Sequence, residues 1–129
     1  SSIYIQEMGM PKKVSDLDNH RLVVYDKDAN PLASDLNWVL YIEAEERPRH
    51  PVLQVNSIYG IFRSVQSGLG IAALPDYMSR EVGNLERVLP EIDGPSVKAF
   101  FVYPEELRDT MRINVLRDFL VSKVKTEKF

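Results

Sequence analysis

Cysteine is absent from the 129-residue chain, which excludes disulfides and thiolate metal sites. Histidine occurs only twice, and His20 and His50 are not at metal-ligand spacing, so we expect no metal and no cofactor. The serine elbow G-x-S-x-G and the glycine-rich phosphate loops are also missing. These absences leave the chain without the pattern of a common enzyme.

A basic excess is missing as well, because 16 Lys and Arg stand against 19 Asp and Glu for a net charge of −3. The charge balance argues against nucleic-acid binding by this chain itself. Apolar runs are far shorter than the roughly 20 residues that a membrane helix needs. The first residues, SSIYIQEMG, form no secretion signal, so we expect a cytoplasmic protein without a membrane partner. They also lack an initiator Met, so we expect a piece of a longer protein.

Strand and helix patterns alternate along the chain and predict an α/β fold. Short apolar runs predict strands at 21–26, 37–43, 52–56, 70–75 and 97–104. Stripes at helical spacing predict helices at 3–9, 57–69, 76–83 and 105–125. The segment 52–75 reads as one strand-helix-strand unit, in which Gly68 and Gly70 allow positive φ and close backbone approach.

Two places stand out as a candidate ligand site, because α/β proteins bind ligands beyond the carboxyl ends of their strands. Tyr25 and Asp26 end one predicted strand, and Asn56 and Ser57 follow another and open a helix. Backbone N–H groups at that helix start would suit an anion or another polar group. A core tyrosine followed by a turn residue is the alternative for Tyr25 and Asp26.

Other polar and aromatic residues have plainer interpretations. Trp38 fits a half-buried strand position as well as it fits a binding role. Arg47, Arg49 and His50 form a small basic spot, for which we expect an exposed turn rather than a phosphate clamp.

Four segments follow one another along the chain: YIQEMGMPKKVSDLDNHRLVVY, SVQSGLGIAALPDYM, LERVLPE and FFVYPEELRDTMRINVLRDFL. In this order they resemble the effector-binding domain of LysR-type transcriptional regulators, and the resemblance runs from Tyr4 to about Leu120. The motif SGLGIAALPDY, with VLPE and VYP at matching distances, is its most specific part.

The resemblance implies a periplasmic-binding-protein type 2-like fold, in which two α/β subdomains enclose a ligand cleft. Residues 3–93 would form the second subdomain. Residues 94–129 would return to the first subdomain as a strand and the C-terminal helix. The first half of that subdomain and the DNA-binding helix-turn-helix domain would then be absent from this chain.

The function implied is that of an effector-sensing domain of a bacterial regulator, not of an enzyme. A small ligand, an anion or another polar molecule, would bind in the cleft and change DNA-dependent transcription. The expected partners are this ligand, a homo-oligomer (a dimer or a tetramer), and DNA only through the missing N-terminal domain. The implied ligand residues are Tyr25, Asp26, Asn56, Ser57 and Ile58.

Two other classes share this fold. The chain could be a fragment of a type 2 solute-binding protein of a transport system. The whole protein would carry a signal peptide and both lobes; neither is visible here, and truncation would hide both. An enzyme related to prephenate dehydratase or porphobilinogen deaminase would need a catalytic Ser/Thr arrangement or a cofactor cysteine.

Overall fold

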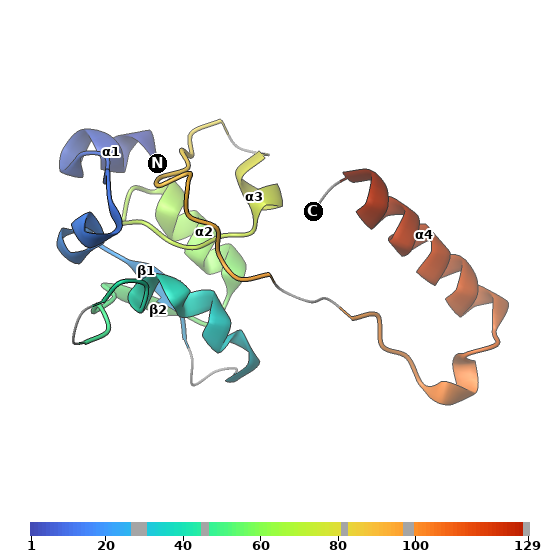
Figure 1. Ribbon diagram of the computed structural model, residues 1–129. Helices are drawn as coiled ribbons and strands as arrows, with labels where there is room; N and C mark the ends of the chain where they lie inside the picture. Colours follow the sequence, from blue (N-terminus) through green and yellow to red (C-terminus); the bar gives the residue numbers. More distant parts are fainter. Residues whose placement is uncertain (27–30, 45–46, 81–82, 97–99, 128–129) are drawn as a thin grey trace. The chain divides into compact units, whose positions relative to one another are not determined.

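The computed structural model describes residues 1–26, 31–44, 47–80, 83–96 and 100–127 of the chain. The chain divides into two compact units, Ser1–Pro95 and Ser96–Phe129 (Figure 1). Within the described residues, the first unit combines a parallel strand pair with helices, and the second is helical. Mixed helices and strands agree with the predicted α/β class, whereas the assignment of 3–93 and 94–129 to subdomains stays a prediction.

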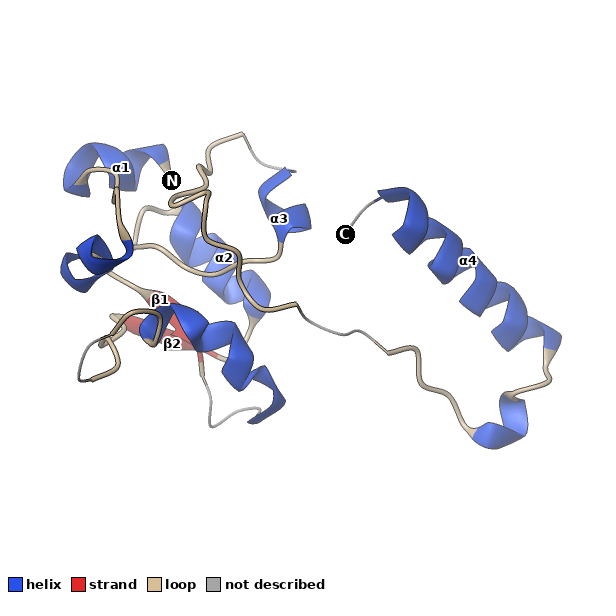
Figure 2. Cartoon of the chain, viewed as in Figure 1, coloured by secondary structure: helices blue, strands red, loops and turns tan. Residues whose placement is uncertain are grey.

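Strand β1 (Val23–Tyr25) lies at the centre of the first unit and pairs in parallel with strand β2 (Leu53–Val55) (Figure 2). On its other edge, β1 continues back to Leu22, which forms a single parallel bridge with Ile71. Both strands lie inside the predicted ranges. The predicted strand at 70–75 is wrong beyond this bridge, because the described residues after Ile71 form no further pairing.

Helix α2 (Ile58–Gln66) packs against both strands, as its apolar stripe predicts. Its buried residues, Ile61, Phe62 and Val65, each contribute about 1.5–3 kcal/mol by leaving water. The helix approaches β2 closely because it carries Gly60 there. A Cβ at Gly60 would lie 2.7 Å from a methyl carbon of Val55.

Helix α1 (Ser2–Met8) ends at Gly9, which has a positive φ of 81°. A 3-10 turn, η1 (Val14–Asn19), follows and buries Leu17. Helices and strands together enclose one apolar cluster of buried residues, which comprises Tyr4, Val14, Leu17, Leu22, Val24, Val39, Leu40, Ile71 and Leu89.

Tyr4 joins α1 to the start of β1 through its hydroxyl group. The side chain is 1% exposed, and the hydroxyl accepts a hydrogen bond from the Arg21 backbone N–H at 2.9 Å. The hydroxyl also shares a hydrogen bond with Nδ1 of His20, at 2.9 Å. Burial lowers the pKa of His20, and the nearby Asp16 carboxylate partly opposes that shift.

The lowered pKa of His20 makes the stability of the chain depend on pH. As pH falls below the ordinary value of 6.5, the unfolded chain takes up the proton while the folded chain resists it. The free energy of unfolding therefore decreases as the pH drops from 6.5 to the lower pKa of His20 in the folded chain. We expect His20→Gln to remove this component, measured by urea unfolding at about pH 7.5 and about pH 5. His50→Gln is the control: His50 is exposed, so this variant should keep the pH dependence of the wild type. If His20→Gln lost as much stability between the two pH values as the wild type, the result would contradict the account.

The predicted strand at 37–43 is wrong. Its first residues belong to a 3-10 helix, η2 (Pro31–Leu40), instead. The adjacent residues Val39 and Leu40 are both buried in the same cluster, whereas an extended chain would direct them to opposite faces. Tertiary packing therefore overrides the β propensity of this apolar run.

Gly68 and Gly70 have different roles. Gly68 has the predicted positive φ, 84°, but the prediction was wrong for Gly70, which lacks one. The close approach predicted for this turn is what requires Gly70. A Cβ at this position would lie 2.3 Å from the backbone oxygen of Arg21, the acceptor for the Ile71 N–H.

We expect Gly70→Ala to lower the free energy of unfolding by about 3 kcal/mol, because the added methyl group forces the Ile71 bridge apart. Gly83→Ala is the matched control, since no atom lies within 4 Å of its Cβ position. Thermal or urea unfolding of both variants measures the difference. Equal stability of the two variants would show that the backbone of Gly70 does not lie so close to the Arg21 carbonyl.

Two further segments complete the first unit. Helix α3 (Asp76–Arg80) begins at Asp76, within the predicted helix 76–83; residues 81–82 lie outside the described ones. The segment after Gly83 is irregular and returns Leu89 to the core, with a positive φ of 50°.

The second unit contains a 3-10 turn, η3 (Glu105–Leu107), and helix α4 (Met111–Glu127). The helix confirms most of the prediction for 105–125. Of the predicted strand at 97–104, the structure describes residues 100–104, and for these residues the prediction is wrong. Phe100 and Val102 are 79% and 84% exposed there, and no strand pairs with them among the described residues.

The apolar stripe of α4 is exposed rather than buried within this unit. Phe119 is 55% exposed, and a shallow, open surface follows one face of the helix. The residues of this surface are Met111, Arg112, Val115, Leu116 and Phe119. Across the described ranges of the chain, we find no helix that is long and apolar enough to span a membrane.

Candidate functional site

The carboxyl ends of β1 and β2 lie side by side, because the two strands are parallel and paired up to Tyr25 and Val55. Asp26 continues from β1, and its backbone N–H donates to the carbonyl of Val55 at 3.0 Å. Asn56 and Ser57 continue from β2 into helix α2. The fold thus brings together the two segments that the sequence singled out separately.

Tyr25 connects these two segments with its side chain. Its hydroxyl donates a hydrogen bond to the backbone carbonyl of Asn56 at 2.9 Å, and the side chain is half-buried. The ring is fixed at one end by the backbone of β1 and at the other by the bond of its hydroxyl group, so it presents a fixed apolar surface at the strand ends. Its position is therefore suited to contact with a small molecule.

Ser57 begins helix α2 as its N-cap residue. Its hydroxyl oxygen accepts a hydrogen bond from the Gly60 N–H at 3.3 Å, and the residue has the extended backbone typical of this position. The hydroxyl keeps its own proton as a donor. The first N–H groups of the helix and its positive dipole end lie at the same place, beside the half-buried Ile58.

Asn37 also belongs to this group, and the sequence reasoning placed it only at the start of a strand. It is 5% exposed. Its side-chain oxygen accepts from the Tyr25 N–H at 2.9 Å, and its side-chain nitrogen donates to the Tyr25 carbonyl at 2.8 Å. The sequence carried one signal for this role: Asn37 is the single amide beside an otherwise apolar run, NWVLYI, and a polar side chain buried with such a run needs hydrogen-bond partners.

Arg49 is buried and structural, so the expectation of an exposed basic turn was wrong for this residue. Its side chain is 5% exposed and forms an ion pair with Asp18. The guanidinium also donates to the backbone carbonyls of Ile42 at 2.7 Å, Val39 at 3.2 Å and Val14 at 3.4 Å. These bonds connect η1 to η2 and leave no place for a phosphate.

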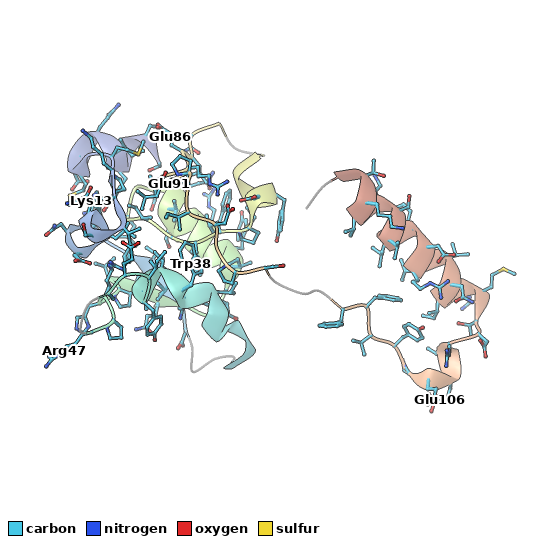
Figure 3. All side chains as sticks on the ribbon, in the orientation of Figure 1. Lys13, Trp38, Arg47, Glu86, Glu91 and Glu106 are labelled. Carbon is cyan, nitrogen blue, oxygen red and sulfur yellow. The ribbon has the colours of Figure 1, made fainter. Side chains whose placement is uncertain are left out.

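We expect Arg49→Lys to lower the free energy of unfolding by about 2 kcal/mol, because one ammonium cannot replace the fork of donors to three carbonyls. Arg47→Lys serves as the control, since Arg47 is exposed and points away from the body of the unit (Figure 3). Urea unfolding of the two variants measures the contrast. A comparable effect at both positions would rule out the buried role of Arg49.

The remaining candidates have structural explanations. Trp38 is half-buried and covers Gly94, where a Cβ would lie 2.9 Å from the indole nitrogen. In the part of the chain that the structure describes, no group of three His, Asp or Glu side chains is placed to hold a metal ion.

Comparisons with known proteins point to one family. The model of the LysR substrate binding domain matches residues 4–125. An uncharacterized HTH-type transcriptional regulator of Haemophilus influenzae is 30% identical over 78% of this chain and 35% of its own length. The uncharacterized HTH-type transcriptional regulator YhjC of Escherichia coli is 27% identical over 95% of this chain and 42% of its own. The chain thus spans less than half the length of these relatives, and no solved structure matches it significantly.

Proposed function

The chain belongs to the LysR substrate-binding domain family, and from this premise we propose that it is the effector-sensing part of a bacterial transcription regulator. The family consists of regulator domains with a periplasmic-binding-protein type 2-like fold and is not an enzyme family. Both curated relatives are named as HTH-type transcriptional regulators. The names of these relatives favour a regulator over a solute-binding protein of a transport system.

The proposed ligand site is the group Tyr25, Asp26, Asn56, Ser57 and Ile58. The observation that carries this proposal is the junction of β1 and β2 at their carboxyl ends, where Tyr25 binds the Asn56 carbonyl and α2 begins. In open α/β sheets, this is the edge at which ligands bind.

The ligand proposed for this site is small and anionic. The hydroxyl proton of Ser57 and the first backbone N–H groups of α2 would donate hydrogen bonds to a carboxylate or a similar group. The ring of Tyr25 and the side chain of Ile58 would contact the apolar part of the molecule. These donors and apolar surfaces come from two different segments, so the ligand would bridge them.

For the whole regulator, we propose that ligand binding shifts the equilibrium between closed and open arrangements of the two subdomains. DNA would be bound by a helix-turn-helix domain, such as the names of the relatives indicate, in a homo-oligomer. A ligand changes such an equilibrium only by binding one arrangement more tightly than the other.

A matched pair of variants at Ser57 tests the charge of the ligand. Asp and Asn are both good N-cap residues, so Ser57→Asp and Ser57→Asn both keep α2. The added carboxylate of Ser57→Asp should weaken binding of an anion about tenfold or more, whereas Ser57→Asn should retain it. Titrations of the ¹⁵N-labelled chain with acetate and succinate, followed by amide NMR shifts, measure this.

Acetamide and succinamide are the neutral controls for the same titration. We expect the carboxylates to shift the amide signals of residues 56–58 and of Tyr25 and Asp26, and the neutral amides to leave them in place. Equal shifts with both kinds of molecule, or shifts confined to α4, would contradict the proposed site.

A further inference from the structure

The strongest unexplained feature is the buried side-chain amide of Asn37, which binds both polar groups of one backbone residue. The Tyr25 N–H donates to its Oδ1 at 2.9 Å, and its Nδ2 donates to the Tyr25 carbonyl at 2.8 Å. The two residues are 12 positions apart, so this is a tertiary contact. Such a pair of bonds reproduces what a neighbouring strand would provide.

The place of this contact on β1 is informative. The backbone groups of odd-numbered residues face the edge that carries Ile71: Arg21 accepts from the Ile71 N–H at 2.8 Å, and the Val23 N–H donates to Ile71 at 2.9 Å. Tyr25 is the next odd-numbered residue along this edge. Asn37 thus occupies the pairing position that the strand of Ile71 would have filled had it continued.

The opposite edge of the strand end is held by β2. There the Asp26 N–H donates to the Val55 carbonyl at 3.0 Å, and the Tyr25 hydroxyl donates to the Asn56 carbonyl at 2.9 Å. The backbone of Tyr25 is therefore held from the Asn37 side, and its side chain is held from the β2 side. Loss of the Asn37 amide would free the first of these two anchors.

We infer that Asn37 is the positioning residue of the candidate site: its amide fixes the end of β1 so that Tyr25 and Asp26 face the start of α2. This inference rests on the proposed function. It also connects the site to η2, because Asn37 lies in the same 3-10 helix as the core residues Val39 and Leu40. Only a primary amide supplies an acceptor and a donor in the peptide-like geometry that Tyr25 requires.

Amide hydrogen exchange tests the positioning directly in the 129-residue chain. We expect Asn37→Ala to raise the exchange rate of the Tyr25 N–H about tenfold relative to the Val23 N–H, the factor that corresponds to one lost hydrogen bond. Val39→Ala is the matched control, because it removes core contacts from the same helix and leaves the Asn37 amide in place. A purely structural effect would change both amides together in both variants.

Binding of succinate supplies the second measurement. Asn37→Ala should weaken it about tenfold, because the end of β1 loses the two hydrogen bonds that order it. Val39→Ala should leave it unchanged once both variants are corrected for the folded fraction. Asn37→Gln guards against a variant that fails to fold, because it keeps a neutral primary amide. Its extra methylene group displaces the amide from Tyr25, so we expect faster exchange at Tyr25 together with weakened binding, each by less than in Asn37→Ala.

The outcomes separate this inference from the function on which it rests. Unchanged Tyr25 exchange and unchanged succinate affinity in Asn37→Ala, with succinate bound at residues 56–58 of the wild type, would overturn the positioning role alone. Absence of succinate binding by the wild-type chain at this site would overturn the proposed ligand site, and the positioning role with it.

Discussion

The first unit depends on one constraint, that the buried strand β1 must have hydrogen-bond partners on both edges. An unpaired backbone polar group in this interior would cost as much as several apolar contacts contribute. The chain meets the constraint with three partners of different kinds. The strand β2 covers one edge, Ile71 covers the beginning of the other, and the side chain of Asn37 covers its end. Because the last partner is a side chain, the strand stops at Tyr25, and the polar segment that follows meets the start of α2.

Much of this arrangement could be predicted from the pattern of residues. The unbroken apolar run before Tyr25 predicts a buried strand, and the stripe after Ser57 predicts the helix that covers it. The rule that ligands bind at the carboxyl ends of parallel strands then selects the same two segments that the fold brings together. Whether a ligand binds these residues is a question of chemistry, which the pairing alone does not decide.

The failures have a common physical cause, which is tertiary context. The run after Asn37 has strand-forming residues, yet Val39 and Leu40 share one core as part of a 3-10 helix, and the Asn37 amide takes the place of a strand. Arg49 looks like an exposed charge in its local sequence, but three backbone carbonyls and Asp18 surround it. The stripe of α4 forms the predicted helix, while its burial depends on contacts that local pattern does not encode.

The central claim is that a small anion binds where β1 and β2 end and α2 begins. Crystals of the chain soaked in succinate test this most directly. The account predicts density for a carboxylate beside the Ser57 hydroxyl and the first N–H groups of α2, against the ring of Tyr25. Density only on the exposed apolar face of α4, with the start of α2 unoccupied, would contradict it.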